Sequence, residues 1–500
     1  MSFISLPTPT QTLISLALLY TIYHIISAVD LWNRRRAFKR DRGVRDAPRL
    51  PQKDPILGLD LFLENIASLK NHTLLETTAS RFRDTGLNTF RLVALGRHMH
   101  ATLEPENLKT CHHAHSREML RPNFVRSQVG DVQTFEKHVS RLIATIVPGQ
   151  EVDLSERFFR LTIDSATEFL FGESTDSLIK DGNDGFSEAF TQSQDFIGNL
   201  ARWGNWAKLF PANKRFQKDR DFVHNFVNSY VQKGLARRDQ LLAAEKNSSP
   251  DHQQQQPPER YLFIDALVRQ TTDPIRIRSE LLNILLAGRD TTASLLSNLW
   301  FTLARRPDIW RKLQSEITTA TILPPPPHQK SSSSPSSNSS SQPPTFDQLK
   351  SMKYLRACLN ESLRLYPVVP LNSREALEDT ILPRGGGEDG MAPIFIPKGG
   401  LVSWNLWALH RRKDYFGEDA EKKGLRPGWE YLPFNGGARI CLGQQFALTE
   451  ASYVTVRICQ EFPEEEKEEK QEEEPWREFL TLTCTSLNGA KVVLNRYRNL

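Results

Sequence analysis

The stretch FNGGARICLGQQFA, residues 434–447, places a single cysteine between a glycine-rich loop and a segment, residues 442–461, that is predicted to be a helix. The positive end of a helix dipole favours the thiolate of Cys441, and a thiolate is a strong metal ligand. Gly436 and Gly437 let the backbone approach a flat, bulky group, and loop N–H groups can tune a metal by bonding to its sulfur ligand. The alternative is a buried structural cysteine, the usual fate of a free thiol.

The spacing of this stretch is Phe434-x-x-Gly437-x-Arg439-x-Cys441-x-Gly443. Several residue types fixed at once make a specific signal, which resembles the haem-binding signature of the cytochrome P-450 family of haem-thiolate monooxygenases. The resemblance implies a haem b with Cys441 as its axial ligand and Arg439 paired with a propionate. It also implies that Phe434 packs near the sulfur, that Gly437 shapes the loop, and that Gly443 lets the next helix pass close to the ring.

Composition gives broad limits. The chain has 500 residues, which allow two or three average domains or one large enzyme domain. The resemblance favours one domain that is mainly α with small β-sheets. A net charge of +5 is far from that of a nucleic-acid-binding domain, so no nucleic acid is expected as a partner. Five cysteines without paired metal spacing fit a reducing compartment.

The N-terminal region is predicted to cross a membrane. Residues 13–29, LISLALLYTIYHIISAV, are almost wholly apolar, and counting back to Pro9 gives about 20 residues, the length of a spanning helix. Seven basic residues follow between positions 34 and 45, so the positive-inside rule keeps the rest of the chain in the cytosol. A cleaved signal peptide would need a basic start, which is missing, and a buried core helix is the other alternative.

These features divide the chain into an anchor at residues 1–30, a basic and proline-rich linker at 31–55, and a catalytic domain at 56–500. A Pro/Ser tract at 323–344 inside that domain is predicted to be a disordered surface insertion. A hairpin is expected at residues 89–102. The aromatic-rich residues 196–210 are either ordinary core or, by the resemblance, a cover of the substrate entrance that dips into the membrane.

A second chemical centre lies in the apolar residues 279–306, which read as a long buried helix. Its centre, AGRDTT at 287–292, contains glycine and consecutive threonines, which weaken a helix, and a hydroxyl bonded to the backbone could open a turn there. This could be no more than a tolerated kink. The block also matches the family's oxygen-binding groove, which implies that Thr291 orients water and that Asp290 takes part in proton supply.

Glu361 and Arg364 are three residues apart, so they share a helix face and can pair, as surface residues often do. Followed by Leu-Tyr-Pro at 365–367, they resemble the family's second signature, in which the pair is buried and locks the chain that presents the cysteine. By the same resemblance Arg374 is a candidate partner of a haem propionate.

Two stretches depart from the family pattern. Residues 111–126 resemble a helix that holds a propionate, with Arg117 in place, but His113 stands where the family has tryptophan and the preceding loop is missing. Residues 419–429 lack the family's Pro-Glu-Arg element, for which Arg426 is a possible substitute. A tolerated variant, a loss in reading the coding sequence, and a haem-binding or haem-free protein without turnover all remain open.

The resemblance implies insertion of one atom of O2 into an apolar substrate, with electrons from NADPH through a partner reductase that docks near Lys422 and Lys423. It also implies a single-pass protein of the endoplasmic reticulum membrane. The motifs AGRDTT, NSRE with a following LPRGGG, and FNGGARICLGQQFALTEA most resemble the fungal branch that hydroxylates n-alkanes and fatty acids at or near the chain end. The tailoring of a secondary metabolite is the alternative.

Overall fold

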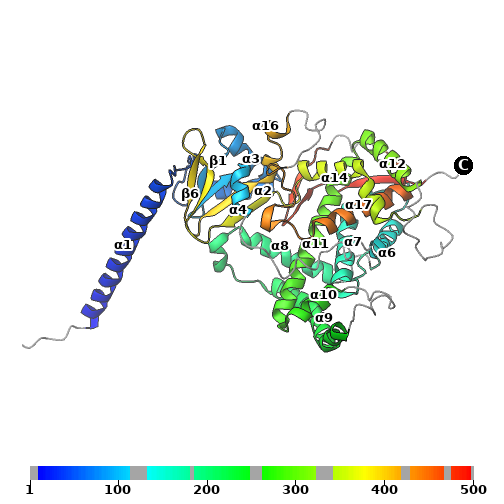
Figure 1. Ribbon diagram of the computed structural model, residues 1–500, viewed down its shortest axis with the longest axis horizontal. Coiled ribbons are helices and arrows are strands. Elements are labelled where there is room, and N and C mark those ends of the chain that lie inside the picture. The colour runs from blue at the N-terminus through cyan, green and yellow to red at the C-terminus, as the bar shows by residue number, and fades with distance from the viewer. Residues whose placement is uncertain are drawn as a thin grey trace, which may run out of the picture. The chain divides into compact units, whose positions relative to one another are not determined.

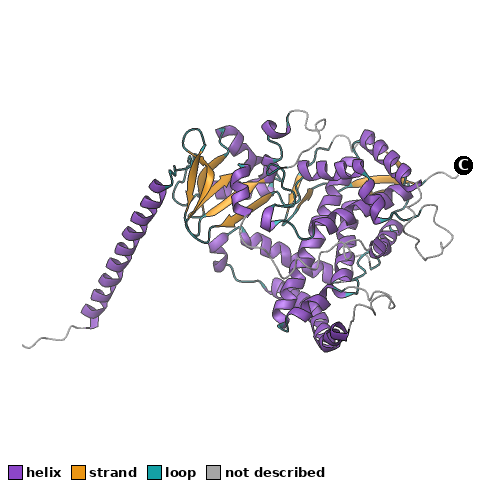
Figure 2. Ribbon diagram, viewed as in Figure 1, coloured by secondary structure: helices purple, strands orange, loops and turns teal. Residues whose placement is uncertain are grey.

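A computed structural model describes residues 9–112, 132–180, 185–247, 262–322, 342–417, 428–466 and 474–496. Over these ranges the chain is mainly helical with short strands (Figure 2), as the sequence predicted. Its contacts divide the chain into two units. Unit 1 contains residues 1–58, 82–111 and 373–404, and unit 2 contains residues 59–81, 112–372 and 405–500.

Helix α1, Pro9–Asp41, begins unit 1 (Figure 1). Among the described residues it is the one helix whose length and apolar composition suit a membrane span, and none of its apolar window is buried by protein. The helix continues past residue 30 into the predicted linker. Residues 31–41 include four arginines, one leucine, one alanine and one lysine, which favour helix, and no proline follows until Pro48.

The predicted hairpin at 89–102 is confirmed. Strand β1, Thr89–Ala94, pairs antiparallel with β2, Arg97–Thr102. Leu95 and Gly96 join them with positive φ angles of 49° and 73°, as a two-residue hairpin turn requires. Strand β2 runs parallel to β7, Leu401–Asn405, and β7 neighbours β4, Leu371–Glu375.

Two further strands and one helix also belong mainly to unit 1. Strand β5, Thr380–Gly386, pairs antiparallel with β6, Ala392–Ile396. Helix α4, Pro105–His112, follows β2.

Unit 2 contains most of the helices. In chain order they are α2 Leu59–Lys70, α3 Leu74–Thr85, α6 Val132–Ala144, α7 Leu154–Phe171, α8 Phe186–Ala201, η2 Gly204–Leu209, α9 Lys214–Asn247, α10 Phe263–Gln270, α11 Pro274–Leu303, α12 Pro307–Ile322, α13 Phe346–Ser351, α14 Lys353–Leu365, α15 Leu406–Leu409, α16 Lys413–Phe416, η4 Gly437–Arg439 and α17 Gln444–Glu461. Its strands are β3 Glu151–Asp153, β8 Glu464–Glu466, β9 Glu478–Leu480, β10 Cys484–Ser486 and β11 Lys491–Asn495.

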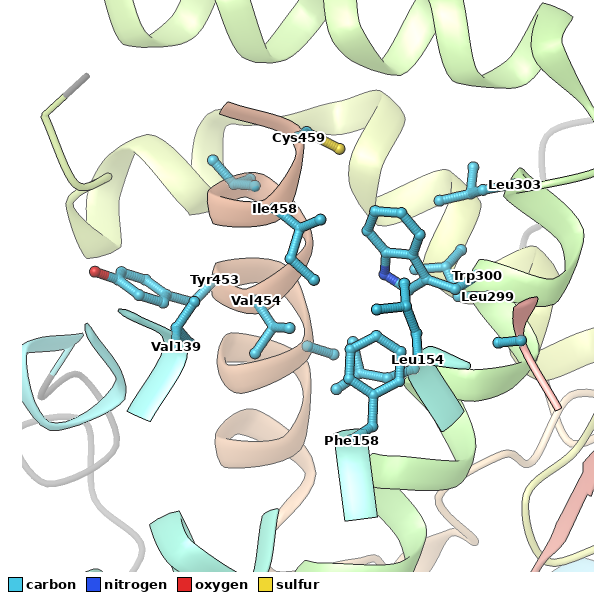
Figure 3. Close-up of a cluster of buried hydrophobic side chains, with 14 of the residues drawn as sticks. Val139, Leu154, Phe158, Leu299, Trp300, Leu303, Tyr453, Val454, Ile458 and Cys459 are labelled. Carbon is cyan, nitrogen blue, oxygen red and sulfur yellow. The ribbon is translucent and has the colours of Figure 1, made fainter. Parts of the chain in front are cut away.

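The core of unit 2 lies between α6, α7, α11 and α17 (Figure 3). Phe158 from α7, Trp300 from α11 and Tyr453 from α17 are among its largest fully buried side chains. The side chains of α11 are buried without interruption from Thr292 to Phe301, as predicted for a helix through the middle of a domain. This burial holds α11 rigidly against α17, the helix that follows Cys441.

The aromatic-rich residues 196–210 end α8 and form η2. Trp203 packs with Phe62 and Phe210 at ring distances of 5.0 and 4.8 Å, as core residues do. Trp206 and Leu209 are exposed. Both interpretations of this stretch therefore have residues that fit them.

Several predictions concern residues outside the described ranges. These are His113 and Arg117, most of the Pro/Ser tract at 323–344, and the stretch at 418–427 with Lys422, Lys423 and Arg426.

Candidate active site

The loop before Cys441 is a tight turn stabilised by its own backbone. Asn435 and Gly437 have positive φ angles of 59° and 57°, and asparagine and glycine are the residues that adopt them most readily. The N–H of Cys441 donates to the carbonyl of Phe434 at 2.8 Å and closes the loop. Helix α17 starts at Gln444, two residues later than predicted.

The glycines of this loop allow close packing. A Cβ on Gly436 would lie 2.9 Å from the ring of Trp429, and one on Gly437 would lie 3.3 Å from the carbonyl oxygen of His112. The buried ring of His112 also reaches Asn435, with Nε2 3.2 Å from Oδ1. Side chains larger than hydrogen would push the loop off these supports.

Cys441 is an exposed residue, although protein atoms surround its thiol. This burial among protein atoms raises its pKa, while the backbone N–H groups of Gly443 and Gln444 act in the opposite direction. Those N–H groups point at the sulfur as expected, but they do not by themselves outweigh burial. A bound metal cation would favour the thiolate form of Cys441.

The residues around Cys441 fit a haem. A cysteine sulfur with two backbone N–H groups directed at it is a donor set that suits haem iron. A Cβ on Gly443 would meet no heavy atom within 4 Å, so no described side chain fills the space beside it. Arg439 lies half-buried at the end of η4, and Phe434 packs against the core of unit 2.

Helix α11 has one open face in the same unit. Ala287, Gly288 and Thr291 are accessible, whereas their neighbours Arg289, Asp290 and Thr292 are buried. Positions 287, 288 and 291 lie on one side of a helix. The Thr291 hydroxyl donates to the carbonyl of Ala287 at 2.6 Å, so the predicted hydroxyl-to-backbone bond forms while the helix stays unbroken.

Asp290 belongs to a polar network with α8 that the sequence did not indicate. Its Oδ2 accepts from Nε2 of Gln194 at 3.1 Å, and its Oδ1 lies 3.1 Å from Nη1 of Arg289. Arg289 also donates to Gln194 at 3.2 Å and to Thr191 at 2.8 Å. Burial raises the pKa of Asp290, and Arg289 and Gln194 oppose this rise.

Glu361 and Arg364 form the predicted pair. Nε of Arg364 donates to Oε2 at 2.8 Å and Nη2 donates to Oε1 at 2.6 Å. Arg364 is buried and its Nη1 donates to the carbonyl of His410 at 3.0 Å. His410, which sequence reasoning missed, accepts from the N–H of Leu432 through its ring, at the start of the cysteine loop.

Arg374 lies in unit 1, on β4. Its Nη1 donates to the carbonyl of Ser373 at 2.8 Å, and its guanidinium carbon lies 5.4 Å from the ring centre of Trp404.

A family model named "Cytochrome P450" matches residues 77–488. The chain belongs to the cytochrome P450 family of haem-thiolate monooxygenases, and the family implies a haem cofactor.

The relatives are fungal. Cytochrome P450 monooxygenase himC of Aspergillus japonicus is 39% identical over 92% of this chain and 85% of its own length. Cytochrome P450 52A12 of Debaryomyces hansenii is 39% identical over 82% of this chain and 85% of its own. Cytochrome P450 52A1 of Candida tropicalis is 39% identical over 93% and 82%.

A solved structure, the haem domain of cytochrome P450DA, has the same fold. It covers 91% of this chain and 99% of its own, with a TM-score of 0.66 and 19% identity.

Proposed function

We propose that this monooxygenase hydroxylates n-alkanes or fatty acids at or near the chain end. The observation that supports a working oxygen site is the coexistence, in unit 2, of an exposed cysteine, Cys441, and an open face of α11 at Thr291. The open face begins with Ala287 and Gly288, two small residues that leave room for an alkyl chain.

The proposed roles follow from the chemistry of each side chain. Cys441 would hold the haem iron through its thiolate, and the haem would supply the activation of O2. Thr291 holds a water by its hydroxyl, and Asp290 exchanges protons with that water from its buried network. Glu361 and Arg364 are structural. The remaining proposed haem contacts are Phe434, Gly437, Arg439, Gly443, Arg117 and Arg374.

Electron supply is proposed to come from NADPH through a partner reductase, with Lys422 and Lys423 as docking residues. Reversal of both charges should slow electron transfer from the reductase, because charges at the rim of an interface act mainly on the association rate. The rate of reduction should also depend less on ionic strength. Unchanged reduction kinetics would rule out docking at these two lysines.

We also propose that α1 anchors the protein in the endoplasmic reticulum membrane as a single span, with the catalytic part in the cytosol. The basic residues at the end of α1 support this orientation. The division into an anchor at 1–30, a linker at 31–55 and a catalytic domain at 56–500 belongs to the same proposal.

The substrate class rests on the motifs AGRDTT, NSRE with LPRGGG, and FNGGARICLGQQFALTEA. Overall sequence identity does not distinguish the candidate functions, because himC, 52A12 and 52A1 are each 39% identical to this chain. Tailoring of a secondary metabolite is therefore the second candidate. A haem-binding or haem-free protein without turnover is the third candidate, and it is suggested by the two departures from the family pattern at 111–126 and 419–429.

Two experiments test the proposal in sequence. The first is the carbon monoxide difference spectrum of the reduced, membrane-expressed protein beside Cys441→Ser, in which a long-wavelength band should appear only in the unaltered protein. The second is product analysis after turnover of dodecanoic to octadecanoic acids with NADPH and reductase. Terminal hydroxy acids support the proposal. Haem binding without any hydroxylated acid contradicts the fatty-acid proposal in favour of the second candidate or a haem-binding protein without turnover, and absence of haem favours a haem-free protein.

A further inference from the structure

The last turns of α1 are fastened to the rest of unit 1. Arg35 donates from Nε to Oδ2 of Asp379 at 2.9 Å and from Nη2 to Oδ1 at 2.8 Å. Oδ1 of Asp379 also accepts the backbone N–H of Lys398 at 2.7 Å. A two-pronged arginine–carboxylate pair fixes both distance and orientation, and here the backbone holds the carboxylate in place.

A ring contact strengthens the same junction. Phe38 meets Phe395 of β6 edge-on at 5.7 Å, and Nζ of Lys39 lies 5.1 Å from the centre of that ring. Positions 35, 38 and 39 share one helix face, so a single face of α1 holds both Asp379 and Phe395. We call these five residues the clasp. Figure 1 shows the end of α1 beside β6.

The clasp stands at a defined distance from the apolar span. Residue 29 is the last of the apolar stretch, and α1 has no break before Asp41. At about 1.5 Å per residue, Arg35 is roughly 9 Å beyond the end of the span. The headgroup layer of one leaflet is about 5–8 Å thick. Trp32, which is exposed three residues earlier, suits that interface.

The partner of Arg35 brings a second segment to this level. Asp379 ends the turn at residues 376–379, and Leu377 in that turn is 84% exposed. An exposed leucine two residues from a carboxylate that is paired at the membrane surface is placed to contact lipid rather than water.

We propose that the clasp makes α1 and the adjoining strands of unit 1 one rigid body and so places the 376–379 turn at the outer edge of the phospholipid headgroup layer, with Leu377 as its lipid contact. This rests on the membrane anchoring given under Proposed function. The clasp, rather than a loose linker, then sets the orientation of unit 1 on the membrane.

The test uses the full chain in phosphatidylcholine and phosphatidylserine vesicles that carry a photoactivatable phospholipid. Cross-linked lipid is mapped by mass spectrometry, and labelling of residues 375–384 is divided by labelling of α1. We expect several-fold less turn labelling in Arg35→Ala and in Asp379→Asn, and near-normal labelling in Asp379→Glu, which keeps a carboxylate for Arg35 and an acceptor for Lys398. Arg34→Ala is the matched control, because Arg34 lies on the same helix outside the clasp and pairs only with Asp30 among the contacts described.

Asp379→Asn keeps an acceptor for Lys398, so a local loss of the turn does not confuse the result. A labelled α1 with an unlabelled turn, or a turn labelled equally in all variants, overturns the inference alone. An unlabelled α1 refutes the anchoring proposal and this inference with it. The hydroxylation of fatty acids is scored separately and bears on neither.

Discussion

Arg364 donates from Nη1 to the backbone carbonyl of His410 at 3.0 Å, and the ring of the same histidine accepts the N–H of Leu432 at 3.1 Å. Leu432 in turn accepts the N–H of Asn435 at 3.1 Å. This series of hydrogen bonds joins the Glu361–Arg364 pair on α14 to the loop that presents Cys441. Burial lowers the pKa of His410 to about 3, so its ring is neutral and can accept throughout the physiological range.

Arg364→Lys is therefore expected to loosen the cysteine loop. A lysine cannot form the two-pronged bond to Glu361 and also reach the carbonyl of His410. Because Glu361 is partly exposed, we expect a loss of about 2 kcal/mol in the free energy of unfolding, below the range for fully buried pairs. Urea unfolding and the carbon monoxide spectrum measure the change, and haem content should fall with stability.

Arg306→Lys is the matched control for that variant. Arg306 pairs with Asp308 at the surface, where such a pair contributes at most about 1 kcal/mol. Equal losses in the two variants would contradict a special role of the Arg364 contacts.

Local motifs explain what the sequence could predict. The cysteine loop, the Glu361–Arg364 pair and the 89–102 hairpin each depend on residues close together in the chain. His410 could not be found in this way, because its partners are 46 and 22 positions distant and no pattern marks it. The continuation of α1 to Asp41 was available from helix propensity, but the dense basic cluster was interpreted as a linker.

The two adjacent threonines of α11 should differ in effect. Thr291 is accessible and bonds to Ala287, whereas the hydroxyl of Thr292 is buried and has no hydrogen-bond partner among the described residues. We expect Thr291→Val to lower product formed per NADPH by about 10- to 100-fold, with the electrons lost to hydrogen peroxide. Thr292→Val should leave coupling unchanged and not reduce stability, since it removes an unsatisfied buried hydroxyl. Similar coupling in both variants would refute a proton role for Thr291.

The contact between Gln194 and Asp290 gives a prediction about pH. Burial raises the pKa of Asp290, and the Gln194 amide opposes this rise by donating to the carboxylate. Gln194→Leu removes that donor, so the pKa of Asp290 should rise further. If ionised Asp290 takes part in proton supply, the acidic limb of the pH profile of coupled turnover moves to higher pH.

Thr191→Val is the control for Gln194→Leu. Thr191 lies on α8, as Gln194 does, and its hydroxyl accepts a hydrogen bond from Arg289. The valine variant removes that bond but leaves the bond between Gln194 and Asp290. An acidic limb that stays at the same pH in Gln194→Leu, or that moves by as much in Thr191→Val, would contradict the role of Asp290 in proton supply.

The Asp290 network also illustrates what sequence reasoning could not reach. Gln194 and Thr191 are more than 90 positions before their partners Asp290 and Arg289, on a helix whose polar residues carry no motif. Arg289 was quoted only as part of AGRDTT, and a buried arginine is rare enough that no composition argument would have placed it inside. Only the packing of α8 on α11 identifies its partners.

Glu450 on α17 is a buried carboxyl group whose described partner is the hydroxyl of Ser165 on α7. Burial raises its pKa to about 8, and the bond from Ser165 only partly opposes this. The carboxyl group is therefore protonated in the folded protein at neutral pH, whereas an unfolded glutamate ionises near pH 4.3 as a rough reference. The folded state thus holds a proton that the unfolded state releases.

The free energy of unfolding should consequently fall as pH rises from about 4.5 to 8, by up to roughly 1.4 kcal/mol per pH unit from this group, and level off above that window. Glu450→Gln keeps the size and removes the charge, so its curve should lack this fall and lie on the order of 5 kcal/mol above the unaltered protein near pH 8. Urea unfolding across the range measures both curves. Glu188→Gln at an exposed position serves as control and should run parallel to the unaltered protein. Parallel curves for Glu450→Gln as well would mean that Glu450 is ionised when folded, with a counter-charge or water reaching it between α7 and α17.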